Sequence, residues 1–259
     1  MRTKGPPPAG ADAAARASIE TWRLYVGAIP GALFEERDGA ALVVTGIPSS
    51  GFNGVWVERR DAPVAIVERM LDRAASSGVP HCLQLRAGTD PALNELPRRR
   101  GMVLDDEEPT MVLDDRSRLA AALDAPGLTI RRLTPHEGTL HARVAAIGFD
   151  TVLEAFAPAA TEQVLSVPGV RSYVGLADGE PVSTAVGVTC GGATAILAVA
   201  TLPRYRRRGF AAAVTARAVS DGFAAGARWA WLQAAPAATG MYERLGFRPV
   251  DVTAIWVRE

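Results

Sequence analysis

The residues with the clearest chemical potential form a basic turn, Arg206-x-x-Gly209-x-Ala211, between an apolar strand pattern and an apolar helix pattern. The first turn of a helix presents unpaired N–H groups and the positive end of the helix dipole, and both attract phosphate. Gly209 has no Cβ, so phosphate oxygens can approach the backbone closely there. Arg206, Arg207 and Arg208 add positive charge at the same point. The pattern therefore predicts a pyrophosphate-binding turn at the start of a helix.

This turn resembles the acetyl-CoA loop of the GNAT superfamily, whose pattern is Gln or Arg, two residues, Gly, one residue, and then Gly or Ala. The match extends over Thr201-Leu-Pro-Arg-Tyr-Arg-Arg-Arg-Gly-Phe-Ala. A second segment, residues 232–247, is similar to the strand, short helix and Tyr-x-x-x-Gly-Phe ending of the same family. By this resemblance, residues 128–259 are identified as an N-acyltransferase domain that uses acetyl-CoA.

The resemblance implies a role for each matched residue. The loop at 206–212 would hold the pyrophosphate, and the backbone of 199–201 would pair with the pantetheine amides like an added strand. N–H groups near Val199 and Ala200 would polarise the thioester carbonyl, and Tyr242 would protonate the departing thiolate. The implied reaction is direct attack of an amine on acetyl-CoA in a ternary complex. The residues implied for cofactor binding are Val199, Ala200, Thr201, Arg206, Arg207, Arg208, Gly209, Phe210, Ala211 and Ala212.

Such a reaction needs a group that takes a proton from the amine, often a carboxylate working through water. Asp150, Glu154 and Glu162 lie in the helical segment that covers the acceptor site in similar proteins, and we take Glu154 as the candidate base. His136 and His141 occupy an early helix turn and are expected at the surface. The sequence contains no metal-ligand cluster, P-loop or Ser/His/Asp order that would indicate a different chemistry.

The elements that must position these residues follow the same order in both halves of the chain and indicate a mixed α/β fold. In the first half, periodicity and turn signals predict helix 11–26, strands 32–36, 40–45 and 54–58, helix 62–76, an apolar run 82–85, helix 91–96 and closing strands 102–104 and 110–113. In the second half they predict strand 128–132, helices towards 167, strands 172–177, 182–189 and 193–200, a long helix from about 207, strand 229–233, a short helix to 244 and a final strand pair ending near 257.

The two halves also share short similarities at an offset within a few residues of 145. Gly101-Met102 mirrors Gly246-Phe247, and Leu83-Gln84 mirrors Leu232-Gln233. This agreement in order favours an internal duplication. The family resemblance then implies a tandem arrangement of two GNAT-like domains, each a mixed and mostly antiparallel twisted sheet flanked by helices.

The first half lacks the residues that carry the cofactor chemistry. Residues 57–63 contain no glycine, and Pro97 stands where the second half has Tyr242. We therefore predict a disordered leader at 1–10, a degenerate domain without the cofactor loop at 11–115, a linker at 116–127 and the catalytic domain at 128–259.

Composition restricts the function further. The chain has 28 basic and 28 acidic residues, and this zero net charge gives no support to a nucleic-acid or membrane-surface role. Cys82 and Cys190 have no nearby Cys or His at metal-ligand spacing and are expected to be small buried hydrophobic residues in a reducing compartment. Residues 183–202 carry no charge and could span a bilayer, but Gly191-Gly192 divides them and β-branched residues alternate, which predicts a hairpin. We expect a cytoplasmic protein.

Two functions are compatible with the cofactor loop. One is an acetyltransferase that acts on a small-molecule or peptide amine. The other is a non-catalytic acyl-CoA-binding regulator, since the sequence by itself identifies no unambiguous base. The acceptor and the oligomeric state stay open.

Overall fold

The computed structural model describes residues 10–117, 119–123 and 125–258, so positions 1–9 of the predicted leader lie outside the described part. The first half contains α1 (Ala11–Val26), β1 (Leu33–Arg37), β2 (Ala40–Val44), β3 (Asn53–Val57), α2 (Val64–Ser76), β4 (His81–Arg86), α3 (Pro91–Arg99) and β5 (Val103–Leu113). The second half contains α4 (Leu119–Leu123), β6 (Thr129–Arg132), α5 (Gly138–Gly148), α6 (Glu162–Leu165), β7 (Val170–Ala177), β8 (Glu180–Cys190), β9 (Ala193–Thr201), α7 (Phe210–Ala224), β10 (Trp229–Gln233), α8 (Thr239–Leu245) and β11 (Arg248–Arg258).

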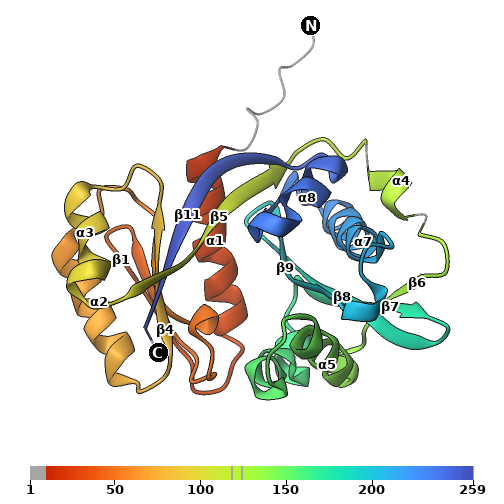
Figure 1. Cartoon of the computed structure of the whole chain (residues 1–259), viewed down its shortest axis with the longest axis horizontal. Helices are drawn as coiled ribbons and strands as arrows, with labels where there is room; N and C mark the ends of the chain where they lie inside the picture. Colours follow the sequence, from red (N-terminus) through yellow and green to blue (C-terminus); the bar gives the residue numbers. More distant parts are fainter. Residues whose placement is uncertain (1–9, 118, 124, 259) are drawn as a thin grey trace, which may run out of the picture.

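All of these strands belong to one sheet, which runs through both lobes of the molecule (Figure 1). The strand order is β1-β2-β3-β4-β11-β5-β10-β9-β8-β7-β6. Only the neighbours β3–β4 and β9–β10 are parallel within the described residues, and the others are antiparallel. The predicted fold class, a mixed and mostly antiparallel sheet flanked by helices, is confirmed.

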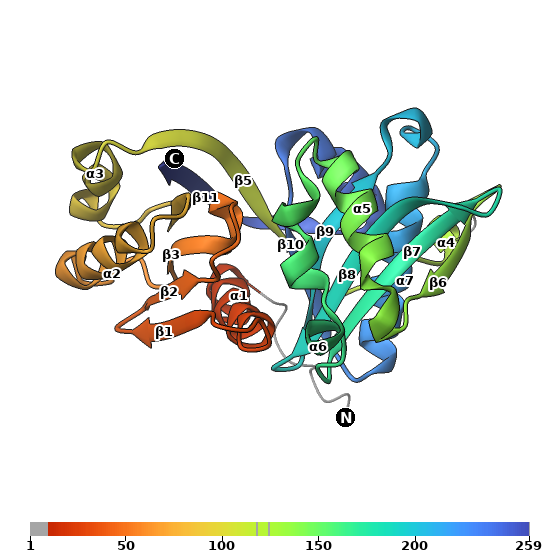
Figure 2. The ribbon, with the colours of Figure 1, turned by 90° about the horizontal axis from the view of Figure 1, so that it is seen from below.

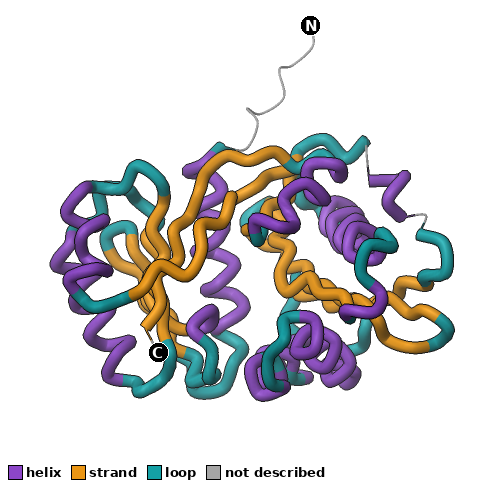
Figure 3. The backbone as a smooth tube through the Cα atoms, viewed as in Figure 1, coloured by secondary structure: helices purple, strands orange, loops and turns teal. Residues whose placement is uncertain are grey.

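The two halves are joined by an exchange of their last strands, β5 and β11, which run side by side from one lobe into the other (Figure 3). The end of β5, residues 110–113, pairs with β10 of the second half. The end of β11, residues 253–258, pairs with β4 of the first half. Both strands contain 11 residues and they begin 145 residues apart, at Val103 and Arg248. The centre of the sheet therefore has an approximate two-fold arrangement, and each half completes the sheet of the other.

Two predictions about these strands are wrong. Residues 102–104 and 110–113 do not form separate strands, because the acidic run between them continues the single strand β5. The predicted final strand pair is the single strand β11. The side chains of the acidic run alternate between exposed and half-buried and show no apolar alternation, while its backbone partners come from the other half of the chain. A strand of this kind has no local signal in the sequence.

Helices cover both faces of the sheet. Side chains of α7 and α8 form one apolar cluster with β10 and the end of β5. Helix α5 lies on the opposite side of β8 from α7 (Figure 2). Helix α1 occupies the centre on the α5 side: Ala14 and Ala17 pack against the second half, and Ile19 and Val26 pack against the first. Apolar burial along α1 thus holds the two lobes together.

The hairpin predicted at Gly191-Gly192 is confirmed, and the structure has a second one beside it. Asp178-Gly179 joins β7 and β8 with φ values of 51° and 82°, the left-handed pair that a tight hairpin turn requires. Gly191-Gly192 joins β8 and β9 with φ values of 56° and 79°. The uncharged stretch 183–202 therefore forms two strands of the sheet. Within the described residues no helix is long and apolar enough to cross a bilayer.

Candidate active site

The end of β9 has a bulge and an unpaired edge. Thr184 of β8 is opposite Ala200, but Val186 is opposite Leu197, so β9 contains one extra residue between these pairs. Ala198, within this bulge, has a φ of 48°. On its other edge, β9 pairs with β10 only through residues 193–195. From Ile196 onward the two strands diverge, so β9 offers free backbone groups along a gap in the described structure.

Two side chains and a close approach of α5 hold the end of β9 in place. The Arg206 guanidinium donates from Nη2 to the carbonyl oxygen of Gly148, at 2.8 Å, and from Nε to that of Thr201, at 3.2 Å. The Ser183 hydroxyl donates to the Ala200 carbonyl at 3.0 Å. An added Cβ at Gly148 would lie 2.7 Å from the Ala200 Cβ, so α5 approaches the bulge very closely. Arg206 therefore links α5 to β9 and positions the loop that follows.

The loop between β9 and α7 forms a cradle of backbone donors. The N–H groups of residues 207–212 have no hydrogen-bond partner among the described residues, and the first helical bond runs from Ala213 to Gly209 at 3.0 Å. Arg207 and Gly209 have positive φ values of 66° and 81°. A turn whose residues alternate between right-handed and left-handed backbone conformations makes an anion-binding concavity. An added Cβ at Gly209 would meet no atom within 4 Å, so space lies in front of the cradle. The arrangement fits a pyrophosphate at the start of α7.

The three loop arginines differ in their contacts. All three are exposed, but the Arg206 guanidinium is engaged with the two carbonyl oxygens named above. The Arg208 guanidinium lies over the Tyr205 ring, 5.2 Å from its centroid. The structure thus leaves Arg207 and Arg208 accessible to a ligand.

Tyr242 lies on α8 and is buried in the apolar cluster between α7, α8 and β10. Its ring packs edge to face on Phe247, with 5.9 Å between the centroids. Ile196 and Val199, at the diverging end of β9, belong to the same cluster. Burial, followed by the negative charge of Glu108, raises the pKa of the Tyr242 hydroxyl. The phenol therefore stays protonated at neutral pH and can donate a proton.

The carboxylates expected near the acceptor lie at the surface. Glu154 is exposed in a short turn, Leu153–Ala155, and Asp150 is exposed directly after α5. Glu162 is exposed, and its Oε2 lies 3.0 Å from Nδ1 of His136. The structure does not bring Glu154 into a contact with the bulge or with Tyr242 that identifies it as the base.

The prediction that His141 lies at the surface is wrong. Its ring is buried where α5 packs on β8, and its Nδ1 lies 2.7 Å from the Thr184 hydroxyl oxygen. That hydroxyl already donates to the Tyr173 carbonyl at 2.8 Å, so Nδ1 carries the proton. Burial lowers the pKa of His141 to about 4. The neutral ring is a structural contact between α5 and the sheet.

Glu108 is a candidate site residue that sequence reasoning missed. It lies on β5, in the first half of the chain, yet its charge acts on Tyr242 of the second half. The side chain is half-buried, and burial followed by the charges of Asp106 and Asp105 raises its pKa to about 7. Its place beside the second half follows from the strand exchange, for which the sequence contains no signal.

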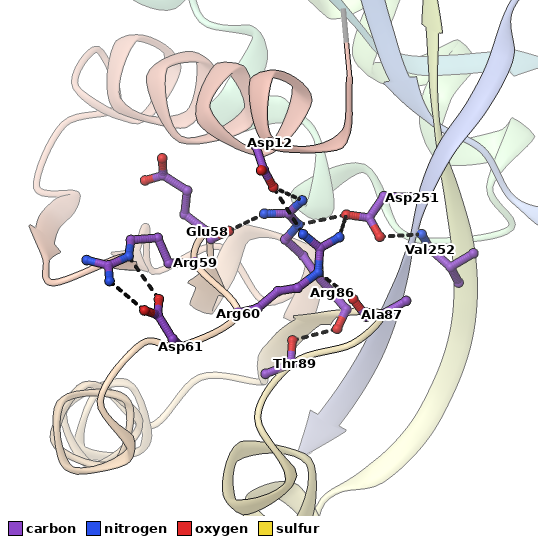
Figure 4. Close-up of polar contacts among 10 residues, drawn as sticks. All are labelled: Asp12, Glu58, Arg59, Arg60, Asp61, Arg86, Ala87, Thr89, Asp251 and Val252. Carbon is purple, nitrogen blue, oxygen red and sulfur yellow. Dashed lines mark hydrogen bonds and ion pairs between the residues drawn. The ribbon is translucent and has the colours of Figure 1, made fainter.

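In the first half, the ends of β3 and β4 correspond to the diverging ends of β9 and β10. An ion-pair network fills the space between them (Figure 4). Arg86, at the end of β4, bonds through Nε to Asp251 at 2.7 Å and through Nη2 to Asp12 at 2.7 Å. It also donates to the carbonyl of Glu58, at the end of β3. Arg60 reaches the same two carboxylates at 3.0 Å each. The ends of β3 and β4, which correspond to β9 and β10, are therefore bridged by side chains.

Comparisons with known proteins agree with this geometry. Residues 145–247 match the profile of the acetyltransferase (GNAT) family. A search of curated protein sequences found no match. Among solved structures, the chain is similar to a GCN5-related N-acetyltransferase from Kribbella flavida, with 20% identity, a TM-score of 0.67 and coverage of 95% of each chain.

Two further structures share the fold over nearly the whole length. One is a GCN5-related N-acetyltransferase from Sphaerobacter thermophilus, with 17% identity, a TM-score of 0.57, and coverage of 97% of this chain and 94% of that one. The other is a tandem GNAT protein from the clavulanic acid biosynthesis pathway, with 14% identity, a TM-score of 0.58 and 97% coverage of both chains. The two-lobed fold is thus shared with a tandem GNAT protein, and the match to the acetyltransferase (GNAT) family profile lies within the second half of this chain, at residues 145–247.

Proposed function

We propose that the second half transfers the acetyl group of acetyl-CoA to an amine by direct attack in a ternary complex. The observation that carries this proposal is the order of two features along the chain. The unpaired edge of β9 leads directly into the free N–H groups of residues 207–212. Acetyl-CoA has amides that can pair with a strand edge, followed by a pyrophosphate that suits a cradle of N–H donors.

The chain's own groups then have distinct roles. The backbone of Val199, Ala200 and Thr201 pairs with the pantetheine arm, and N–H groups near the bulge polarise the thioester carbonyl. A donor of this type is worth about 10²–10³-fold in turnover. As the amine nitrogen bonds to the carbonyl carbon and the C–S bond breaks, Tyr242 gives its proton to the sulfur. Glu154 stays a prediction for the base.

We further propose that each chain holds one acetyl-CoA. In the first half, Arg60 and Arg86 occupy the space between the ends of β3 and β4. The Arg86 and Asp251 side chains are only 7% and 5% exposed, and separating a buried pair costs about 3–5 kcal/mol. A pantetheine arm would have to break this network to enter, so the degenerate first half is expected to bind no cofactor.

The test is release of free thiol from acetyl-CoA over a panel of small-molecule and peptide amines. An active acceptor supports transferase function. Acetyl-CoA binding without thiol release for any amine would instead support the non-catalytic acyl-CoA-binding regulator.

The proton donor is tested by Tyr242→Phe, which keeps the ring and removes the hydroxyl. We expect turnover to fall about 10²–10⁴-fold while acetyl-CoA affinity stays nearly constant. Tyr173→Phe is a matched control, because it removes another hydroxyl from the same apolar cluster, one that donates to Asp221 at 2.9 Å. Wild-type turnover in Tyr242→Phe would reduce this residue to a packing role.

A further inference from the structure

We propose that Glu108, on β5 of the first half, is the general base that takes the proton from the acceptor amine in the second half. This inference rests on the proposed acetyltransfer. In this arrangement the first half contributes one side chain to an active site whose other residues belong to the second half.

The strand exchange brings Glu108 to the edge of the gap. Residues 110–113 of β5 pair with β10, and the Pro109 carbonyl accepts from the Ala234 N–H at 3.0 Å. Glu108 is therefore the first residue of β5 beyond the hydrogen bond between Pro109 and Ala234. At this level β9 and β10 have already separated, because their pairing ends at Ala195 and Trp231. The carboxylate is thus carried to the region into which the acetyl group would extend.

Strand geometry also decides the face on which Glu108 lies. It is directly opposite Thr253 of β11 and two residues from Thr110, so all three side chains share one face. The hydroxyl oxygens of Thr110 and Thr253 lie 3.4 Å apart, and both residues line a cavity of about 40 Å³ beneath α1. Gln233, at the end of β10, lines the same cavity.

This face is opposite the one that carries the donor machinery. The cradle opens α7, and Tyr242 lies in the cluster beneath α7 and α8. In a ternary complex the amine needs its own approach to the carbonyl, and in this proposal it approaches from the α1 side. Acid and base then lie on either side of the gap, close enough for the charge of Glu108 to affect the Tyr242 hydroxyl.

The surroundings of Glu108 suit a base. Within the described residues its side chain takes part in no ion pair or hydrogen bond, so its carboxylate is available. On its own strand the acidic neighbours are Asp105, Asp106 and Glu107; burial is the main cause that disfavours the ionised form of Glu108, and the charges of Asp106 and Asp105 add to it. Tyr242 of α8 is neutral. Arg86 is already paired with Asp251 of β11 and Asp12 of α1. No described cation therefore neutralises the Glu108 carboxylate.

The protons balance in this scheme. The neutral amine forms the C–N bond, and Glu108 takes the proton that leaves the nitrogen. The C–S bond breaks and the sulfur takes the phenolic proton of Tyr242. Solvent then carries the proton from Glu108 back to Tyr242, so the products are the amide and the free thiol. A carboxyl that titrates near neutral pH is well matched to this task.

The experiment compares Glu108→Gln with Glu107→Gln, a control with the same loss of charge at the exposed neighbour on the opposite face. Acetyl-CoA affinity and kcat/KM from pH 5.5 to 9 are measured for both. We expect Glu108→Gln to keep its affinity within about twofold, to lose about 10²–10⁴-fold in kcat/KM and to lose the rise in activity around pH 7. Glu107→Gln should follow wild type. Glu108→Asp, which keeps a shorter carboxylate, should retain the rise at a reduced rate.

The outcomes separate this inference from the proposed function. A wild-type enzyme that acetylates an amine, beside a Glu108→Gln variant with unchanged rate and pH profile, would overturn the base assignment alone. Loss of the pH 7 rise in Glu154→Gln instead would transfer the role to that residue. Wild-type protein that binds acetyl-CoA and acetylates nothing overturns both proposals.

Discussion

Replacing Gly209 with valine is the sharpest test of the phosphate cradle. Gly209 has a φ of 81°, which β-branched residues rarely adopt, so valine strains the backbone by about 1–3 kcal/mol. Its Cβ meets no atom of the protein within 4 Å. The side chain instead projects into the space in front of the free N–H groups. We expect a folded protein whose acetyl-CoA affinity is at least about 100-fold weaker, equivalent to about 2.8 kcal/mol.

The strain has to be separated from the loss of space, and Gly226 offers a matched control. It follows the other end of α7 with a φ of 98°, and an added Cβ there also meets no atom within 4 Å. Gly226→Val should therefore lose comparable stability, about 2–4 °C in Tm per kcal/mol for a chain of this size. Because Gly226 is remote from the cradle along the helix, acetyl-CoA affinity should not change.

The assay is titration calorimetry with acetyl-CoA, accompanied by thermal unfolding of each variant. Unchanged affinity in folded Gly209→Val would refute the cradle. An equal loss of affinity in Gly226→Val would mean that strain in α7, and not the space at its start, controls binding.

Three further predictions concern stoichiometry, positioning and pH. In a calorimetric titration, binding to the whole chain should saturate at one equivalent of acetyl-CoA. Saturation at two equivalents would contradict the proposal that the first half binds no cofactor. Arg206→Lys keeps the charge, but a lysine cannot bind the carbonyl oxygens of Gly148 and Thr201 at the same time. The affinity for acetyl-CoA should therefore fall about tenfold, or about 1.4 kcal/mol. An unchanged affinity would show that only the charge matters. Folding raises the pKa of Glu108 from 4.5 to about 7, so ionisation of this carboxyl lowers the stability of the folded protein as pH rises from 4.5 to 7. Glu108→Gln should therefore raise Tm at pH 8 and leave it unchanged at pH 4, which scanning calorimetry can measure.

Much of the site was predictable because its causes are local. The Gly209 turn, the hairpin at Gly191-Gly192 and helix α1 each depend on residues within one segment, whose periodicity and turn chemistry are visible in order along the chain. The offset of 145 likewise indicated a repeated order of elements, and β5 and β11 reproduce it.

Contacts between distant segments were not predictable in this way. The sequence by itself determined the element order, the basic turn that opens α7 and the absence of a matching turn in the first half. The tertiary structure decided that Arg206 ties α5 to β9, that His141 is buried and that β5 crosses into the second half with Glu108. The physical reason is that backbone pairing carries no side-chain code, so which strand completes a sheet edge depends on the packing of the whole chain.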